Sequence, residues 1–433
     1  MADKSLYVTN ANMVQRKRAE ARFKAYGVFA IGLGIAALIF LMVTIVSKGS
    51  NAFFQTQVTL DVPLLEKTLD KKGERDPEAV KKLMTFAYAP LLKQAFVDIN
   101  AKHGFETELT EKEMSKILSG SANSDLRDFV NEDISKIGET VSFTFYANSR
   151  VDGYLKGRVS RESIVNDKSI SSEQLDYVDQ LREAGVLKKS FNFDFIFGSD
   201  ASDKRPEAAG LGVSMIGSLF MMLVVLALAL PIGVAASIYL EEFAPKNWFT
   251  DLIEVNISNL AAVPSIVFGI LGLAVFINYM HLPQSAPLVG GLVLTLMTLP
   301  TIIISTRASL KAVPPSIRDA ALGLGASKMQ SIFHHVLPLA APGILTGTII
   351  GIAQALGETA PLIMIGMVAF IVDVPASFTD PATALPVQIY IWSDSAERAF
   401  YERSSLAIMV LLLFLISMNL AAVMLRRKFE KKW

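Results

Sequence analysis

The amino-acid sequence predicts an all-α polytopic membrane protein with six transmembrane helices and a large, mainly helical extracytoplasmic insert. Two observations carry this prediction. The 433-residue chain is 52% hydrophobic and only 19% charged, whereas soluble proteins average about 25% charged residues. The hydrophobic residues also gather in long uncharged runs, each able to supply the roughly 20 apolar residues that a spanning helix requires.

Six such runs follow one another along the chain. They are Ala25–Ser47, Ala208–Leu240, Val255–Met280, Leu282–Thr306, Ala341–Val372 with one charged interruption after Gly357, and Ser404–Leu425. The first run exceeds the roughly 7–15 apolar residues of a signal peptide, and no clear cleavage site follows it, so we expect an uncleaved anchor. The predicted organisation is a tail at 1–24, the first transmembrane helix at 25–47, an insert at 48–207, a five-helix core at 208–425 and a tail at 426–433.

The distribution of basic residues predicts how the chain is oriented, because Lys and Arg gather on the cytoplasmic side of membrane helices. The tail at 1–24 carries six Lys or Arg residues, and the tail at 426–433 carries five. Six spans place both tails on the same side, so we expect both termini and the 307–342 loop in the cytoplasm. The insert at 48–207 then lies on the extracytoplasmic side.

The insert has the composition of a folded domain rather than a linker. Thr110 and Glu113 have the spacing of a helix-capping box, and Asp76 precedes Pro77 in the pattern of an N-cap followed by proline. Residues 190–197 alternate aromatic and polar side chains, which predicts a half-buried strand. We therefore expect a mainly helical domain with a few short strands, whose role the sequence does not specify.

Composition excludes several functions. The formal net charge is +0, which does not favour nucleic-acid binding, and the absence of cysteine rules out disulfides and thiolate chemistry. The sequence has no G-x-x-x-x-G-K-[ST] loop, so we do not expect the chain to bind ATP by itself. It has no metal-ligand cluster and no nucleophile–base pair, so no metal site and no catalytic residue is expected.

The segment between the fourth and fifth runs, RDAALGLGASKMQSIFHHVLPLAAPGI (Arg318–Ile344), has an unusual pattern for a loop. Asp319 is placed to favour the N-terminus of a short helix. Gly323 and Gly325 then permit a turn, and a second short helix is expected from residue 327 to about 335, ended ahead of Pro338. The alternative is an ordinary interhelical loop, although most connections are only a few residues long.

This spacing resembles the cytoplasmic coupling motif of ABC-importer permeases, E-A-A-x-x-x-G followed nine residues later by I-x-L-P. The matching positions here are Asp319, Ala320, Ala321, Gly325 and Pro338. The chain departs from the motif twice, with Asp in place of Glu and His335 in place of Ile, and the spacing is kept. The resemblance implies two short helices that fit a groove in a separate ATPase subunit and transmit its movement to the attached spans.

Three further segments, at 239–247, 259–276 and 355–363, look like the PstA-type permease subunit of the bacterial phosphate importer. This resemblance covers the first span and residues 208 onward, but not the insert. It implies a non-enzymatic inner-membrane subunit that forms half of a translocation path by alternating access. The implied partners are a second homologous permease subunit, two ATPase subunits that use the ATP, and an extracytoplasmic phosphate-binding protein.

Two rival functions remain open. A permease for another oxyanion, such as sulfate, molybdate or phosphonate, would carry a similar coupling segment, so phosphate rests on the narrower resemblance alone. A membrane sensor with an extracytoplasmic ligand domain is the alternative of a different class. It would need a cytoplasmic output domain, and neither tail at 1–24 or 426–433 is long enough for one.

The fifth run contains the candidate site residues. Gly343, Gly347 and Gly351 recur every four residues, a pattern that lets a neighbouring helix approach closely. On a continuous helix, Glu358 points along the same face and lies about 22 Å beyond Gly343, well inside the membrane. A carboxylate at that depth is a functional residue by default. The alternative is a protonated side chain in a structural hydrogen bond between helices.

Glu358 and the adjacent Thr359 are therefore assigned to the substrate path, together with Arg307. A carboxylate does not attract phosphate, so Glu358 is expected to pair with an anion-binding cation or to accept a proton from protonated phosphate. Arg307 is the nearest cation along the predicted topology, and arginine suits bidentate recognition of phosphate. The alternative for Arg307 is an anchor on the cytoplasmic side.

Overall fold

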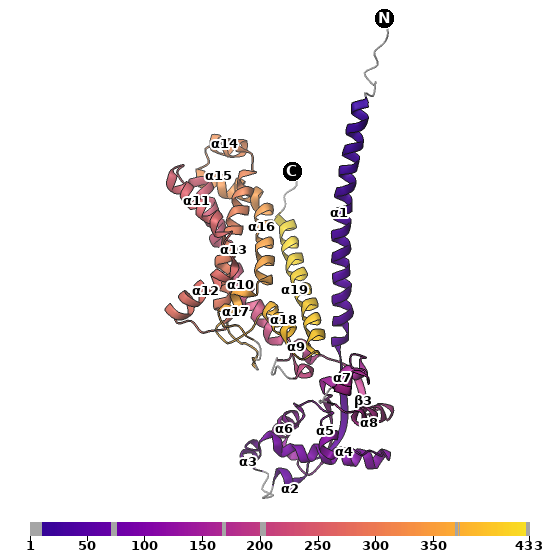
Figure 1. Ribbon diagram of the computed structural model, residues 1–433. Helices are drawn as coiled ribbons and strands as arrows, with labels where there is room; N and C mark the ends of the chain where they lie inside the picture. Colours follow the sequence, from indigo (N-terminus) through magenta and orange to yellow (C-terminus); the bar gives the residue numbers. More distant parts are fainter. Residues whose placement is uncertain are drawn as a thin grey trace.

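The protein consists of a bundle of long helices with a smaller globular insert at one end (Figure 1). The computed structural model describes residues 11–70, 76–166, 170–199, 205–368, 371 and 373–429. Within these residues, five helices are long and apolar enough to cross a membrane, and a sixth span is formed if one bent helix pair is counted. The predicted helical membrane fold is therefore confirmed, and the count of six spans is reached when the bent pair is taken as one span.

The long helices are well defined. They are α1 (Ala11–Gly49), α10 (Gly212–Ile238), α13 (Pro287–Lys311), α16 (Leu337–Gly357) and α19 (Phe400–Phe429). The shorter α18 (Leu385–Asp394) precedes α19. Buried apolar side chains of α10, α13 and α16 form the centre of the bundle, whereas α1 packs only near its C-terminal end, where Gly49 lies against Leu406 of α19.

The third predicted span, at 255–280, is not a straight helix. It is divided between α11 (Trp248–Leu260) and α12 (Ser265–Gly272), which continues as a π-helical segment η7 (Leu273–Tyr279). The two arms meet at 101°. Pro264 is the N-cap of α12, and because proline has no N–H and disfavours helix in the residue before it, the helix ends ahead of it.

The insert is built on a three-stranded antiparallel sheet in the order β2-β1-β3. The strands are β1 (Phe54–Pro63), β2 (Thr140–Tyr146) and β3 (Leu187–Phe191). Its helices are α2 (Glu66–Leu69), α3 (Pro77–Lys81), α4 (Ala89–His103), α5 (Glu111–Ser115), α6 (Ala122–Glu132), α7 (Ser149–Leu155), α8 (Ser172–Glu183) and α9 (Asp194–Phe197).

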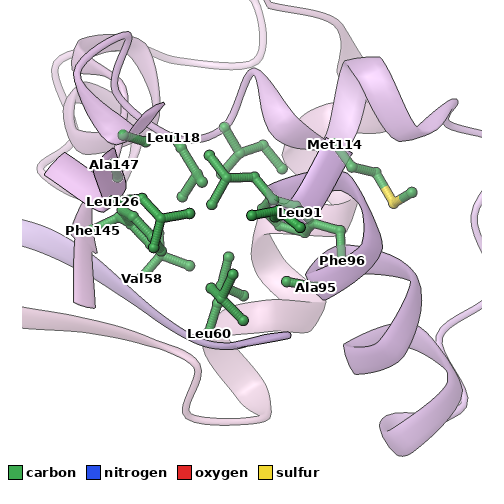
Figure 2. Packing of buried hydrophobic residues seen from close by; sticks show 14 of the residues in the cluster. Val58, Leu60, Leu91, Ala95, Phe96, Met114, Leu118, Leu126, Phe145 and Ala147 are labelled. Carbon is green, nitrogen blue, oxygen red and sulfur yellow. The ribbon is translucent and has the colours of Figure 1, made fainter. Parts of the chain in front are cut away.

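The insert has a hydrophobic core of its own. Alternate residues of β1, including Val58 and Leu60, point toward the helices and meet Leu91 and Phe96 of α4 (Figure 2). This is the period-2 burial that a strand with one covered face shows. A core of this size is typical of a domain that folds around its own apolar side chains, not of a linker.

Local signals in the insert had mixed outcomes. Thr110 and Glu113 form the predicted capping box at the start of α5, and the Asp76 side chain caps α3 ahead of Pro77. The strand predicted at 190–197 is wrong beyond Phe191. The Asn192 side chain accepts a hydrogen bond from the backbone N–H of Phe195 at 3.1 Å, which supports the short helix α9 instead.

The insert and the segment at 315–331 lie at opposite ends of the bundle (Figure 1). The described start of α1 and the described end of α19 both lie at the end that carries residues 315–331. This arrangement is the one that basic residues near the span ends predict. The assignment of that end to the cytoplasm, and of the insert to the other side, stays a prediction.

Candidate functional site

The segment at 315–331 forms two short helices joined by a tight turn. They are α14 (Pro315–Gly323) and α15 (Lys328–Ser331). Gly325 has a positive φ of 90°, and the N–H groups of Gly325 and Ala326 donate to the carbonyls of Leu322 and Ala321 at 2.9 and 3.1 Å. This is the Schellman pattern, which needs glycine at the left-handed position.

The second short helix starts with a cap that the sequence analysis did not single out. The N–H of Gln330 donates to the Ser327 hydroxyl at 3.2 Å, and the N–H of Ser327 donates to the Gln330 side chain at 2.8 Å. This capping box fixes the start of α15 directly after the Gly325 turn. Hydrogen bonds therefore fix both the end of α14 and the start of α15.

Two expectations for this segment are wrong. Asp319 does not lie at the N-terminus of α14, because Pro315 is the first helical residue and Asp319 is the fifth. Asp319 and Ala320 are exposed, whereas Ala321 is buried. Pro338 does not end the second helix, because α15 continues through a π-helical turn, η8 (Ile332–Val336), directly into α16.

The π-helical turn explains how the chain accommodates Pro338. The N–H of Leu337 donates to the carbonyl of Ile332, five residues back. A proline in a regular helix clashes with the carbonyl four residues before it, and a local widening of the helix relieves that clash. The short helix and the fifth span are therefore one continuous rod from Lys328 to Gly357.

Arg318 ties α14 to the ends of two spanning helices. Its guanidinium forms an ion pair with Glu242 at 2.6 Å and donates to the carbonyls of Leu310 and Val313 at 2.9 and 2.8 Å. Glu242 lies in the π-helical turn η6 (Tyr239–Phe243) at the end of α10, and Leu310 lies at the end of α13. The ends of both helices are thus attached to the short helix through one side chain.

Arg307 forms a second cluster at the same end of the bundle. Its guanidinium lies 2.5 Å from Glu254 of α11 and 3.3 Å from Glu241, and Lys311 lies 3.5 Å from Glu241. Arg307 therefore pairs with acids at the end of the bundle that carries residues 315–331. The sequence analysis missed Glu241, Glu242 and Glu254 as partners, although two adjacent acids at the end of an apolar run were a usable signal.

The glycines of α16 pack against α13, as their spacing predicted. Gly343 faces Ser309 and Gly347 faces Ser305, so closely that an added Cβ at either glycine would overlap the serine hydroxyl. At Gly351 a Cβ would lie 3.4 Å from Ile302. These pairs place α13 and α16 antiparallel and fix their register.

Glu358 does not continue the helix that was used to place it. α16 ends at Gly357, and Glu358 adopts an extended conformation with φ −77° and ψ 131°. Thr359 follows as the N-cap of α17 (Ala360–Met364). Glu358 is half-buried, and its position relative to Gly351 follows from this break and not from helical periodicity.

The register of α13 and α16 separates Glu358 from Arg307. Since Gly347 faces Ser305, Glu358 is level with about Leu294 on α13. The 13 residues from 294 to 307 correspond to about 20 Å along the helix axis. In the described part of the chain, Arg307 is therefore paired at one end of the bundle, and the half-buried Glu358 is level with a point about 20 Å away along α13.

The break at Glu358 lies close to the other broken span. Gly269 of α12 packs against α17, where an added Cβ would be 2.7 Å from Cα of Pro361. Irregular backbone at membrane depth is tolerated only where protein buries it or where it lines a cavity. Discontinuous helices near the bilayer midplane are a common way to build a substrate path.

Residues 229–432 match the family described as "Binding-protein-dependent transport system inner membrane component". A phosphate transport system permease protein, PstA 1 of Mycobacterium tuberculosis (strain CDC 1551 / Oshkosh), is 31% identical over 219 residues, which are 51% of this chain and 71% of that protein. The chain belongs to the binding-protein-dependent transport permease family. Residues 10–164 of this permease match a separate family described only as a domain of unknown function.

Two other relatives of the permease have similar coverage. The probable ABC transporter permease protein YqgI of Bacillus subtilis (strain 168) is 29% identical over 261 residues, 57% of this chain and 87% of that protein. The phosphate transport system permease protein PstC of Pasteurella multocida (strain Pm70) is 28% identical over 269 residues, 56% of this chain and 82% of that protein. The chain is thus a multi-pass membrane permease subunit of an ABC transporter.

The packing of this permease makes a testable prediction at Gly347. Replacing Gly347 by alanine is expected to lower the thermal unfolding midpoint of the detergent-purified protein, because the new methyl group overlaps the Ser305 hydroxyl. Overpacking of this kind costs about 1–3 kcal/mol. Adding Ser305→Gly should restore much of the loss, and Gly357→Ala, where nothing lies within 4 Å, is the control. A Gly347→Ala protein as stable as the control would contradict the packing.

Proposed function

We propose that this chain is the transmembrane permease subunit of an ATP-driven importer of inorganic phosphate. The observation that carries the proposal is its similarity to PstA 1 and PstC, both named as phosphate transport permeases, over 71% and 82% of their lengths. The chain would form half of the translocation path in the inner membrane, beside a second, homologous permease subunit. An extracytoplasmic phosphate-binding protein would deliver the anion.

We propose further that α14, the Gly325 turn and α15 dock into a separate ATPase subunit, one of two in the assembly. The tip of this segment is apolar and unusually exposed, with Leu324 at 90% and Met329 at 57% of their full accessibility. Exposed apolar side chains at the end of a rigid projection fit a groove in a protein partner. Arg318 and the continuous rod through η8 connect that tip to α10, α13 and α16.

The path role of Glu358 and Thr359 is a proposal of the same kind. The break in the helix at these residues frees backbone and side-chain groups inside an apolar bundle, about 20 Å from the paired Arg307. With Arg307 engaged by Glu241 and Glu254, the cation that meets the anion near Glu358 would come from the second permease subunit. Glu358 would then orient that cation or accept a proton from protonated phosphate.

The test is to reconstitute the full complex in vesicles and measure which radiolabelled anion accumulates when ATP is supplied. We expect phosphate, and we expect Glu358→Gln to reduce its uptake by about tenfold or more because a carboxylate at this depth is rarely neutral to function. Gln354→Ala, an exposed position one turn earlier on α16, is the matched control.

Three outcomes separate the claims. Accumulation of sulfate, molybdate or phosphonate in place of phosphate would overturn the substrate assignment and favour the oxyanion alternative. Phosphate uptake that Glu358→Gln leaves at the control level, with the complex still assembled, would remove Glu358 from the path. A complex that binds the anion on the insert but accumulates nothing would favour the sensor.

A further inference from the structure

We propose that the insert is clamped to the start of the last span, α19, as one rigid body, so that any displacement of the insert moves α19 with it. The clamp consists of a buried network of charged side chains laid over a shared apolar core. This inference does not depend on which anion the permease carries. It concerns the part of the chain whose family match carries no functional description.

Asp152 of α7 is the centre of the network on the insert side. Its carboxylate accepts hydrogen bonds from the N–H and the hydroxyl of Thr56 at 3.0 and 2.9 Å. It also pairs with Lys156 at 2.7 Å and Arg158 at 2.9 Å. Asp152 is only 2% exposed, so four donors from β1 and from the residues just after α7 are concentrated on one buried carboxylate.

These contacts keep Asp152 ionised. Burial by itself raises the pKa of the Asp152 carboxyl, but the charges of Lys156 and Arg158 and the hydrogen bonds from Lys156 and Thr56 outweigh burial and hold that pKa below its usual range. A charged centre of this kind needs its cations in fixed positions. Lys156 and Arg158 are therefore committed to this location, and both also reach across to the last span.

The same two cations meet the first turn of α19. The Arg158 guanidinium lies 2.7 Å from the Glu402 carboxylate, and the Lys156 ammonium lies 3.8 Å from it. Lys156 and Asp152 belong to the insert, whereas Glu402 is the third residue of α19. The ion pairs thus cross the boundary between the insert and the permease core.

Arg403, the next residue of α19, makes an independent connection. Its guanidinium donates to the side chain of Gln55, the second residue of β1, and lies 5.0 Å above the ring of Phe195 in α9. Arg403 is 4% exposed. Nearby, the carboxylate of Glu207, just before α10, accepts a hydrogen bond from the Ser119 hydroxyl at 2.7 Å. Strand, helix and span are therefore joined at one buried place.

An apolar core continues below the charges. Phe195 of the insert, Trp392 of α18 and Phe400 of α19 follow one another with ring centroids 5.9 Å apart at each step. The remaining buried members of this cluster come from both sides of the boundary and are Ala52, Ala209, Leu211, Leu385, Leu406 and Ala407. Figure 1 shows α7 and α9 beside the ends of α18 and α19 that face the insert.

The charges are best understood as setting orientation rather than adding stability. An apolar replacement of a buried ion-pair network is often as stable or more stable, and the best-attested use of such networks is to fix a register between elements. The apolar core alone could hold the insert against α19 in several orientations, because it is non-directional. The ion pairs of Glu402 and the hydrogen bond and ring contact of Arg403 select one of these orientations.

The experiment measures a distance across the boundary in the full assembled complex. The chain has no cysteine, so Lys112→Cys on the insert and Leu413→Cys on α19, both exposed, can carry two spin labels for pulsed EPR. We expect one narrow distance distribution that is the same without nucleotide and with ATP bound. A broad distribution, or a distance that changes with nucleotide, would overturn the rigid-body proposal in the unmodified protein.

Variants test whether the charges are responsible. In the labelled protein, Glu402→Gln should broaden the distance distribution about twofold, because Lys156 and Arg158 lose their charged partner on α19. Arg161→Gln, which breaks the exposed pairs to Asp176 and Asp179 within the insert, should leave the distribution unchanged. Equal distributions in both variants would contradict the clamp. If the complex with Glu402→Gln does not assemble, the rigid-body proposal is tested by the distances in the unmodified protein without nucleotide and with ATP.

Discussion

Arg318→Gln is expected to reduce transport by the assembled complex by about tenfold or more. Arg318 makes the connection from α14 to both α10 and α13, through Glu242 at 2.6 Å and two backbone carbonyls. Breaking a buried ion pair costs about 3–5 kcal/mol, and because the Arg318 side chain is 22% exposed a smaller loss of about 2–3 kcal/mol is reasonable here. The short helix would remain folded but would no longer hold its place.

The measurement is ATP hydrolysis together with substrate accumulation in the same vesicles. Arg318→Gln should lose accumulation while the ATPase subunits still hydrolyse ATP, since the defect lies in transmission. Exchanging the two charges, Arg318→Glu with Glu242→Arg, should recover part of the transport. Lys246→Gln, at an exposed position outside the two short helices, is the control. A loss as large in this control as in Arg318→Gln would refute a specific role for the pair.

Gly325→Ala should have the second largest effect. Gly325 has φ 90°, a conformation that costs an L-residue about 1–2 kcal/mol. That energy corresponds to a roughly 5- to 30-fold decrease in the population of this turn relative to competing conformations. Because the turn sets the angle between α14 and α15, we expect the affinity for the ATPase subunit, and the coupled transport, to fall by a similar factor.

Gly323 provides a matched comparison for this substitution. It lies two residues earlier, at the end of α14, where an added Cβ would meet nothing within 4 Å and the backbone needs no left-handed conformation. Gly323→Ala should be neutral or slightly stabilising, since alanine favours helix over glycine by up to about 1 kcal/mol. Co-purification of the ATPase subunit with each variant is the direct assay. Equal recovery with both variants would contradict the requirement for the turn.

The sequence predicted the spans well because each apolar run is longer than any soluble core requires. It predicted two short helices with a turn between them because Gly323 and Gly325 interrupt the helical pattern, and the structure has that turn at Gly325. It failed at Glu358 because periodicity assumes an unbroken helix, and Glu358 lies where the helix ends. A proline or a charged residue within an apolar run marks such places, but it does not tell whether the helix bends, widens or ends.

Side-chain partnerships were the least predictable part of the site. Arg307 was placed near the path because it is the nearest cation along the predicted topology, yet it pairs with Glu241 and Glu254 of other elements. Pro338 was expected to end a helix, and a π-helical turn absorbs it instead. The Arg307 pairs join elements far apart in the sequence, which no local pattern encodes. The turn before Pro338 is local, but the sequence does not tell a widened helix from one that ends.

The buried charges at the start of α19 constrain how the insert could be gained or lost during evolution. β1 follows α1 after four residues, and α10 begins shortly after the short helix at Pro206–Ala208. The insert is thus joined to the core by two short connections, and it could be removed as a module. Excision would leave Glu402 and Arg403 without the partners that now neutralise them, at the edge of a membrane. A compact relative without the insert should therefore carry apolar or uncharged residues at these two positions, and gain or loss of the module should require changes there.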